Sequence, residues 1–273
     1  MTKATPRLRL EMLENRWNPA GTVTGSFSRG TWTLTGDTAG NSITINPTAT
    51  PGQFILSGIA TSISGETNPS NVRNIVVNML AGGDAITLND TGIAAALTGS
   101  LTVNGGTEDN YLAINNMTIG ANVSVTNGTN SLGQDQLYIK DSDVLGKVTV
   151  SNGDGDTFTD LRRTSAGSSF IGKGATITNG KGTDSNFLVD YEFGGNVNVK
   201  NGLPGLGDIA GRTVIGNSFN TSSMAVITGN LSVSYTSGYI NSDFLAATEI
   251  GGNVIFDHGT GAAETVFDSS VSI

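Results

Sequence analysis

The segment Gly146-Lys-Val148-Thr-Val150-Ser-Asn-Gly153 decides the fold, because it returns along the chain with small changes. Each copy has a glycine or alanine, then two apolar residues separated by one polar residue, then usually an Asn-Gly turn. Other copies begin at Gly99, Ala121, Gly174, Gly195, Gly229 and Gly252, and the copy at Gly174 is weaker. Most steps are 22–27 residues, and one longer step absorbs an insertion near residues 203–220. Such self-similarity is the signature of a repeat architecture.

A second strand pattern lies between these copies and usually follows an acidic residue. It covers residues 84–88, 109–114, 135–139 and 184–189. Alternation of apolar and polar residues over such short runs, bounded by Gly, Asn or Asp, indicates strands rather than helices. Two or three short strands every 22–27 residues match one coil of a parallel β-solenoid, which buries its inward side chains only against neighbouring coils. The sequence therefore predicts an all-β parallel β-helix of roughly ten coils.

A β-sandwich, or two small ones, is the alternative architecture, because it also has short strands and frequent turns. It is not expected to repeat one unit so regularly. In a solenoid the Asn-Gly dipeptides would be corners, where both residues tolerate a left-handed φ, and their asparagines could stack into a hydrogen-bonded ladder. In a sandwich they would be hairpin turns. The structural turn glycines are Gly105, Gly128, Gly153, Gly180 and Gly202.

The composition excludes several classes of function. The chain of 273 residues contains 38 Gly, only 14% charged residues and a net charge of -9. This acidic balance argues against a nucleic-acid partner, which requires a concentrated basic face. The absence of Cys removes thiolate metal sites and Cys nucleophiles, and the single histidine, His258, leaves little room for His-based catalysis. No apolar run is long enough for a transmembrane helix.

Residues 1–20 differ from the repeats and are expected to form a short helical or irregular leader that could cap the first coil, with residues 21–273 forming the β-solenoid domain. Leu10, Leu13 and Trp17 lie on one helical face of this leader. A conventional secretory signal is not recognisable, because charged residues interrupt the apolar positions.

The leader carries a family resemblance. Residues 7–20 read Arg-Leu-x-Leu-Glu-x-Leu-Glu-x-Arg-x-x-Pro-Ala, which resembles the start of large planctomycete exported or surface repeat proteins. Residues 30–36 and 41–45 resemble the opening repeats that follow that leader. The resemblance implies an extracellular or envelope-associated protein and implies no reaction.

The densest run of carboxylates lies in residues 152–160 and offers Asp154, Asp156 and Asp160 as candidate metal ligands. Calcium is the ion considered, because hard cations prefer clusters of oxygen ligands. The run lacks the spacing of an EF-hand loop, since Thr157 stands where glycine is required. The plainer interpretation is that these aspartates close turns and keep a glycine-rich rod soluble.

The same coil supplies the only set of residues that could serve a polysaccharide lyase or hydrolase. Arg162 and Arg163 follow the aspartates, and Asp160 and Arg162 would share one face of an extended strand. A surface salt bridge, which contributes little to stability, is the simpler explanation of that pair. Aromatic platforms for sugar rings are scarce, and Trp32 is the only Trp outside the leader.

We therefore expect a non-enzymatic structural or adhesive protein of the cell envelope or extracellular space, with polysaccharide or envelope components as possible partners. A carbohydrate-active enzyme and a calcium-stabilised binding module are the alternatives. The last residues, Val271-Ser-Ile273, follow a strand pattern without an amphipathic helix, and no Lys or Arg follows Arg212. We expect the C-terminal coil to self-associate or to be continued, because an uncovered coil exposes unpaired strand edges.

Overall fold

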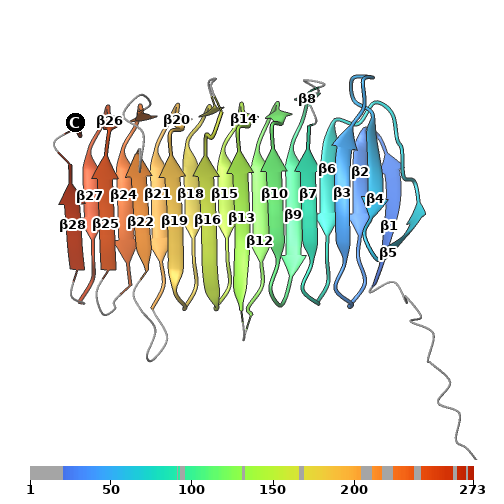
Figure 1. Cartoon of the computed structure of the whole chain (residues 1–273), viewed down its shortest axis with the longest axis horizontal. Helices are drawn as coiled ribbons and strands as arrows, with labels where there is room; N and C mark the ends of the chain where they lie inside the picture. Colours follow the sequence, from blue (N-terminus) through green and yellow to red (C-terminus); the bar gives the residue numbers. More distant parts are fainter. Residues whose placement is uncertain are drawn as a thin grey trace, which may run out of the picture.

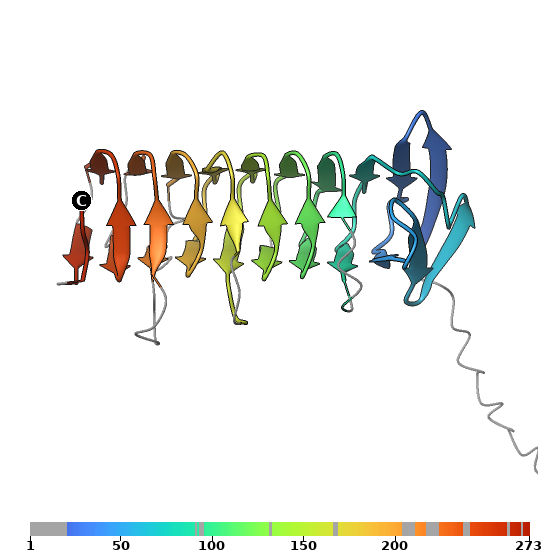
Figure 2. The ribbon, with the colours of Figure 1, turned by 90° about the horizontal axis from the view of Figure 1, so that it is seen from above.

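The computed structural model describes residues 21–90, 92, 96–130, 133–165, 169–203, 211–216, 224–236, 241–260, 263–268 and 270–273. In these ranges the chain forms strands and no helices, and most strands wind into a parallel β-solenoid (Figure 1). The coils stack along the long axis of the molecule, as Figure 2 shows from above. The predicted all-β solenoid is confirmed, and the β-sandwich is wrong.

Three sheets run along the rod, and sheet C begins only at β8. Sheet A has eleven strands, in the order β27 (Val254–Asp257), β24 (Leu231–Tyr235), β21 (Val197–Asn201), β18 (Ala175–Thr178), β15 (Val148–Ser151), β12 (Val123–Asn127), β9 (Leu101–Gly106), β6 (Asn74–Asn78), β2 (Thr31–Thr35), β1 (Gly21–Ser28) and β5 (Thr61–Gly65). Sheet B has ten, in the order β28 (Ala263–Phe267), β25 (Asn241–Ala246), β22 (Arg212–Gly216), β19 (Asp184–Val189), β16 (Asp156–Arg162), β13 (Gln134–Lys140), β10 (Tyr111–Asn115), β7 (Ala85–Asn89), β3 (Ser42–Pro47) and β4 (Phe54–Gly58). Sheet C has seven short strands, in the order β26 (Thr248–Ile250), β23 (Ala225–Ile227), β20 (Glu192–Phe193), β17 (Phe170–Ile171), β14 (Asp143–Val144), β11 (Thr118–Ile119) and β8 (Ala96–Leu97).

The chain visits sheets C, A and B in turn, and it makes six complete turns between β8 and β26 in the described ranges. The predicted number of roughly ten coils is not confirmed. One reason is the N-terminal end, where β1 runs antiparallel to β2 and β4 runs antiparallel to β3. These strands close the first coil instead of adding regular turns. The leader, residues 1–20, lies outside the described residues.

The repeated segment of the sequence is the sheet A strand of each coil. Val148 pairs with Val123 of the preceding coil and with Ala175 of the following one. Two residues later, Val150 pairs with Val125 and Ile177. The weak copy at Gly174 is therefore a full coil in which Ala175 takes the place of a larger apolar residue.

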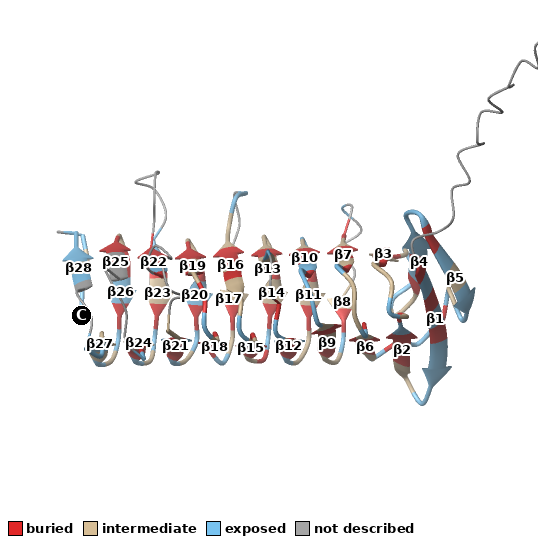
Figure 3. Ribbon diagram, turned by 90° about the horizontal axis from the view of Figure 1, so that it is seen from below, coloured by how far each residue is buried: buried red, intermediate tan, exposed pale blue. Residues whose placement is uncertain are grey.

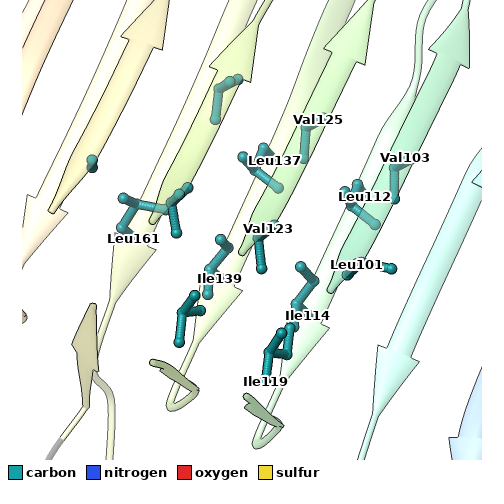
Figure 4. Close-up of a cluster of buried hydrophobic side chains, with 14 of the residues drawn as sticks. Leu101, Val103, Leu112, Ile114, Ile119, Val123, Val125, Leu137, Ile139 and Leu161 are labelled. Carbon is teal, nitrogen blue, oxygen red and sulfur yellow. The ribbon is translucent and has the colours of Figure 1, made fainter. Parts of the chain in front are cut away.

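The core is a narrow column of apolar side chains. Figure 4 shows Leu101 and Val123 of sheet A lying near Leu112 and Leu137 of sheet B, and these side chains are all buried. Since only a few inward side chains belong to each coil, one coil cannot enclose a core alone, and burial depends on the coils on either side. At the C-terminal end this cover is missing in the described chain, and β28 is largely exposed in Figure 3.

Asparagines stack along the corner between sheets A and B. The Nδ2 of Asn127 donates to Oδ1 of Asn152 at 2.9 Å, and Asn152 donates in the same way to Asn179 at 2.8 Å. Asn179 continues the row to Asn201 at 2.8 Å. The ladder considered from the sequence is present, and it satisfies side-chain amides that are buried from water.

The glycines of the Asn-Gly corners are required by close stacking. The expected left-handed φ is found at none of the five, which are Gly105, Gly128, Gly153, Gly180 and Gly202. Positive φ lies at other residues of these turns, with 75° at Glu108 and 128° at Gly155, and at the corner between sheets B and C, with 50° at Asp141 and 58° at Asp190. A Cβ atom on Gly180 would lie 2.3 Å from the carbonyl oxygen of Gly153, and one on Gly202 would lie 1.8 Å from that of Gly180. The backbones of successive coils therefore leave no room for a side chain here.

Candidate binding face

The three candidate metal ligands have separate contacts. Oδ1 of Asp154 accepts a hydrogen bond from the Lys181 backbone at 2.9 Å, and Oδ1 of Asp156 accepts one from the Thr183 backbone at 2.7 Å. Both bonds join one coil to the next. Asp160 instead lies within β16 and accepts from Nε of Arg162 at 3.1 Å. In the part of the chain that the structure describes, no three His, Asp or Glu side chains are grouped to hold a metal ion.

Other acidic residues of the second strand pattern also join coils. Asp84 accepts from the Asn41 backbone at 2.7 Å, and Asp135 accepts from the Asn110 backbone at 3.0 Å. Asp184 accepts from the Thr157 hydroxyl at 2.9 Å. Burial raises the pKa of Asp84 and Asp135 to about 6 and that of Asp184 to about 7. These carboxyl groups support the stack of coils from the inside.

Aromatic side chains gather on the outer face of sheet B. Tyr111, Tyr138, Phe158 and Phe187 come from four successive coils, on β10, β13, β16 and β19. The ring centroids of neighbouring members lie 5.4, 5.5 and 5.3 Å apart, with interplanar angles of 35–42°. We call these four residues the aromatic stripe. Tyr111 is 40% exposed and the other three are partly buried.

The stripe follows a zigzag between two rows of the sheet. Gln136 of β13 pairs with Tyr111 and Phe158 in the neighbouring coils, so those two rings share one row. Asp160 of β16 pairs with Tyr138 and Phe187, so these two rings share the other row. Each ring thus contacts a ring displaced by one coil and two residues, which lets bulky side chains pack without standing directly on one another.

Three cations border the aromatic stripe. Nζ of Lys140 lies 4.3 Å from the centroid of the Tyr138 ring. The guanidinium carbons of Arg162 and Arg212 lie 5.9 and 5.6 Å from the centroid of Phe187. Cations at these distances are attracted by the negative face of an aromatic ring. We call Lys140, Arg162 and Arg212 the cationic border.

Asp160 is enclosed beneath this border. Its side chain is only 5% exposed, whereas that of Arg162 is 33% exposed. Burial raises the pKa of Asp160, and the positive charges of Arg162 and Lys140 act against that rise. The pair that the sequence suggested is thus a positioning contact, in which a buried carboxylate holds one guanidinium against the outer face of the sheet.

Two residues that the sequence analysis considered lie away from this face. Trp32 is fully buried in β2, with Nε1 donating to the Glu66 carbonyl at 3.0 Å, so it offers no platform to a sugar. His258 lies in the last coil, where its Nε2 contacts the Thr265 hydroxyl at 2.8 Å and its ring stacks on Tyr235. His258 therefore lies at the corner between β27 of sheet A and β28 of sheet B.

The aromatic stripe was missed in the sequence. A signal for it existed, because each member stands at an outward position of the strand that follows an Asp- or Asn-containing turn. Recognising the stripe also required the register between coils, which spacings of 27, 20 and 29 residues between its members conceal.

Comparison of the chain with protein-family models, with curated proteins and with solved structures finds no match. Among the residues described here, no helix is long and apolar enough to cross a membrane.

Proposed function

We propose that this chain is a non-enzymatic structural or adhesive rod of the cell envelope or extracellular space. The supporting observation is how the polar side chains are used. Asparagines and aspartates could have formed a reactive site, but they form hydrogen bonds between consecutive coils instead. Asn152 bonds to Asn179, and Asp156 bonds to the backbone of Thr183. The outward Asp160 is enclosed and paired with Arg162, which makes it a poor acid or base for an external substrate.

The proposed location rests on the resemblance of residues 7–20 to planctomycete exported and surface proteins. The rod shape agrees with such a role, because a solenoid presents long faces whose surface groups repeat from coil to coil. An adhesive protein uses such a face to contact an extended partner at many points.

The C-terminal coil is the proposed point of assembly. Phe267 pairs with Leu245 and occupies the same inward position, yet Phe267 is 48% exposed while Leu245 is fully buried. Ile255 and Val266 are also exposed on the edge strands β27 and β28. We propose that a further β surface covers this coil, supplied by a second copy of the chain or by a continuing polypeptide.

The non-enzymatic role is tested by incubating the purified protein with a panel of neutral and acidic polysaccharides. We expect neither new reducing ends nor the ultraviolet absorbance of unsaturated uronate products. Fractionation of the source cells, followed by detection with an antibody, should find the protein with the envelope or the medium. Turnover of any polymer that disappears in the Asp160→Asn variant would instead support the polysaccharide lyase or hydrolase.

A further inference from the structure

The outer face of sheet B carries both aromatic and cationic side chains, and both kinds are scarce in this chain. The protein has 14 Lys and Arg against 23 Asp and Glu, and only 6% of its residues are aromatic. Yet four aromatic rings and three cations occupy five successive strands, β10, β13, β16, β19 and β22. This concentration of scarce residue types requires an explanation beyond the stacking of coils.

The cations of the border are available to a partner. In the described ranges no carboxylate lies within 4 Å of the Lys140 ammonium or of the Arg212 guanidinium, and the ion pair of Arg162 uses its Nε. Asp156, at the start of β16, is directed to the Thr183 backbone. Each cation thus lies over an aromatic ring with donors left for an external anion.

We propose that the aromatic stripe and the cationic border bind a linear carboxylated polysaccharide laid along the rod. Aromatic rings supply large apolar contacts to the C–H faces of sugar rings. Guanidinium groups recognise carboxylates through paired hydrogen bonds, and a lysine ammonium adds a point charge. The rings recur at 5.3–5.5 Å from coil to coil, so a polymer that follows the axis contacts several of them at once.

This inference rests on the adhesive role proposed above and names its partner. A linear polymer fits better than a small molecule, because the contacts extend over five coils and each is weak at a partly solvated surface. A carboxylated sugar fits better than a neutral one, because binding a neutral chain would leave Lys140 and Arg212 without counter-ions.

The experiment measures binding of polygalacturonate to the full chain by isothermal titration calorimetry at low ionic strength. Fully methyl-esterified polygalacturonate has the same backbone without the charge, and polyglutamate has the charge without the sugar. We expect the first polymer to bind at least about ten-fold more tightly than either of the others, since it alone uses both the stripe and the border.

Variants locate the site. We expect Lys140→Gln with Arg212→Gln, and separately Tyr111→Ala, to weaken binding by about ten-fold or more. The matched control is Lys173→Gln with Lys200→Gln, which removes the same charge from the turn before β18 and from β21 in sheet A. It should change affinity by less than about two-fold. Far-ultraviolet circular dichroism confirms that each variant is folded.

The proposal is overturned if wild type does not bind polygalacturonate, if polyglutamate or the methyl ester binds as tightly, or if the control pair weakens binding as much as the border pair. In each of these cases, a protein that is folded and does not cleave the polysaccharide would leave the proposed structural role in place. Cleavage of polygalacturonate by the wild-type chain would instead overturn both proposals.

Discussion

Nδ2 of Asn179 donates a hydrogen bond to Oδ1 of Asn201 at 2.8 Å, although 22 residues separate them. The same asparagine receives a bond from Asn152, so it links three consecutive coils. All three amides are buried, and water cannot replace a missing partner. The ladder therefore aligns the coils as well as stabilising them.

Replacing Asn179 by Leu should lower the free energy of unfolding by about 2–5 kcal/mol, because amides of Asn152 and Asn201 lose partners in a buried site. Urea denaturation followed by circular dichroism measures the change. Asn198→Leu, at an exposed outward position of β21, serves as the control and should shift stability by less than about 0.5 kcal/mol. Equal effects of the two substitutions would show that the ladder contributes nothing.

The stacked glycines of the Asn-Gly corners should tolerate no methyl group. Gly180→Ala places a Cβ 2.3 Å from the carbonyl oxygen of Gly153, so the backbone must shift, and we expect a loss on the order of 2 kcal/mol or more. Gly83→Ala meets its nearest atom at 3.1 Å, the Asp109 carbonyl oxygen, and should have a smaller effect. Thermal unfolding of both variants decides the point, and a neutral Gly180→Ala would contradict the close stacking.

Stability should fall as the pH rises from 4 to about 8. Burial raises the pKa of Asp84 and Asp135 to about 6 and that of Asp184 to about 7, so the folded state holds protons that the unfolded state releases near pH 4. The stabilisation from these three carboxyl groups is complete below their pKa in the unfolded chain. It is lost as the pH rises through their pKa in the folded chain. Each group contributes a slope of up to about 1.4 kcal/mol per pH unit inside its window.

Urea denaturation of wild type and of Asp184→Asn between pH 5 and pH 8 measures this slope. The variant should show a shallower dependence on pH, because one titrating group is gone. Asp257→Asn, which removes an exposed carboxylate, serves as the control for the loss of one negative charge. A wild-type stability that rises steadily over this range would refute the assignment.

The open C-terminal coil should make the isolated chain associate as its concentration increases. Lysines at Ile255 and Val266, both exposed on edge strands, should keep it monomeric, because charge on an edge opposes pairing. Thr149→Lys with Thr176→Lys adds the same charge on inner strands of sheet A and should leave association intact. Analytical ultracentrifugation gives the answer, and a wild-type chain that stays monomeric at high concentration would exclude assembly of copies through this end.

Asp156→Asn should destabilise the chain by about 1 kcal/mol, equally in millimolar calcium and in chelator, because its carboxylate holds the Thr183 backbone. Melting temperatures under the two conditions test this. If calcium raises the melting temperature of wild type and not that of the variant, the calcium-stabilised module regains support.

Local patterning was enough to predict the repeated strands of sheet A and four of the strands of sheet B. Val148 and Val150 alternate with polar residues, and the same alternation returns at Val197 and Val199. An isolated coil cannot bury such residues, so the regular return of the pattern already required stacking. The ladder at Asn152 could be considered from the sequence for the same reason.

The number of turns, the antiparallel closure by β1 and β4, and the aromatic stripe were decided by the tertiary structure. Tyr138 and Phe158 become neighbours only when the turns between their strands fix which residues pair across coils, and turn lengths vary too much for sequence spacing to reveal this pairing.

The partners of the aspartates could not be predicted from the sequence either. Asp156 and Asp160 are alike in sequence, but one supports the next coil and the other holds Arg162, because side-chain partners come from coils more than 20 residues away as well as from the same strand. Alternation along a strand is a local property, whereas register between coils depends on inter-coil hydrogen bonds and packing.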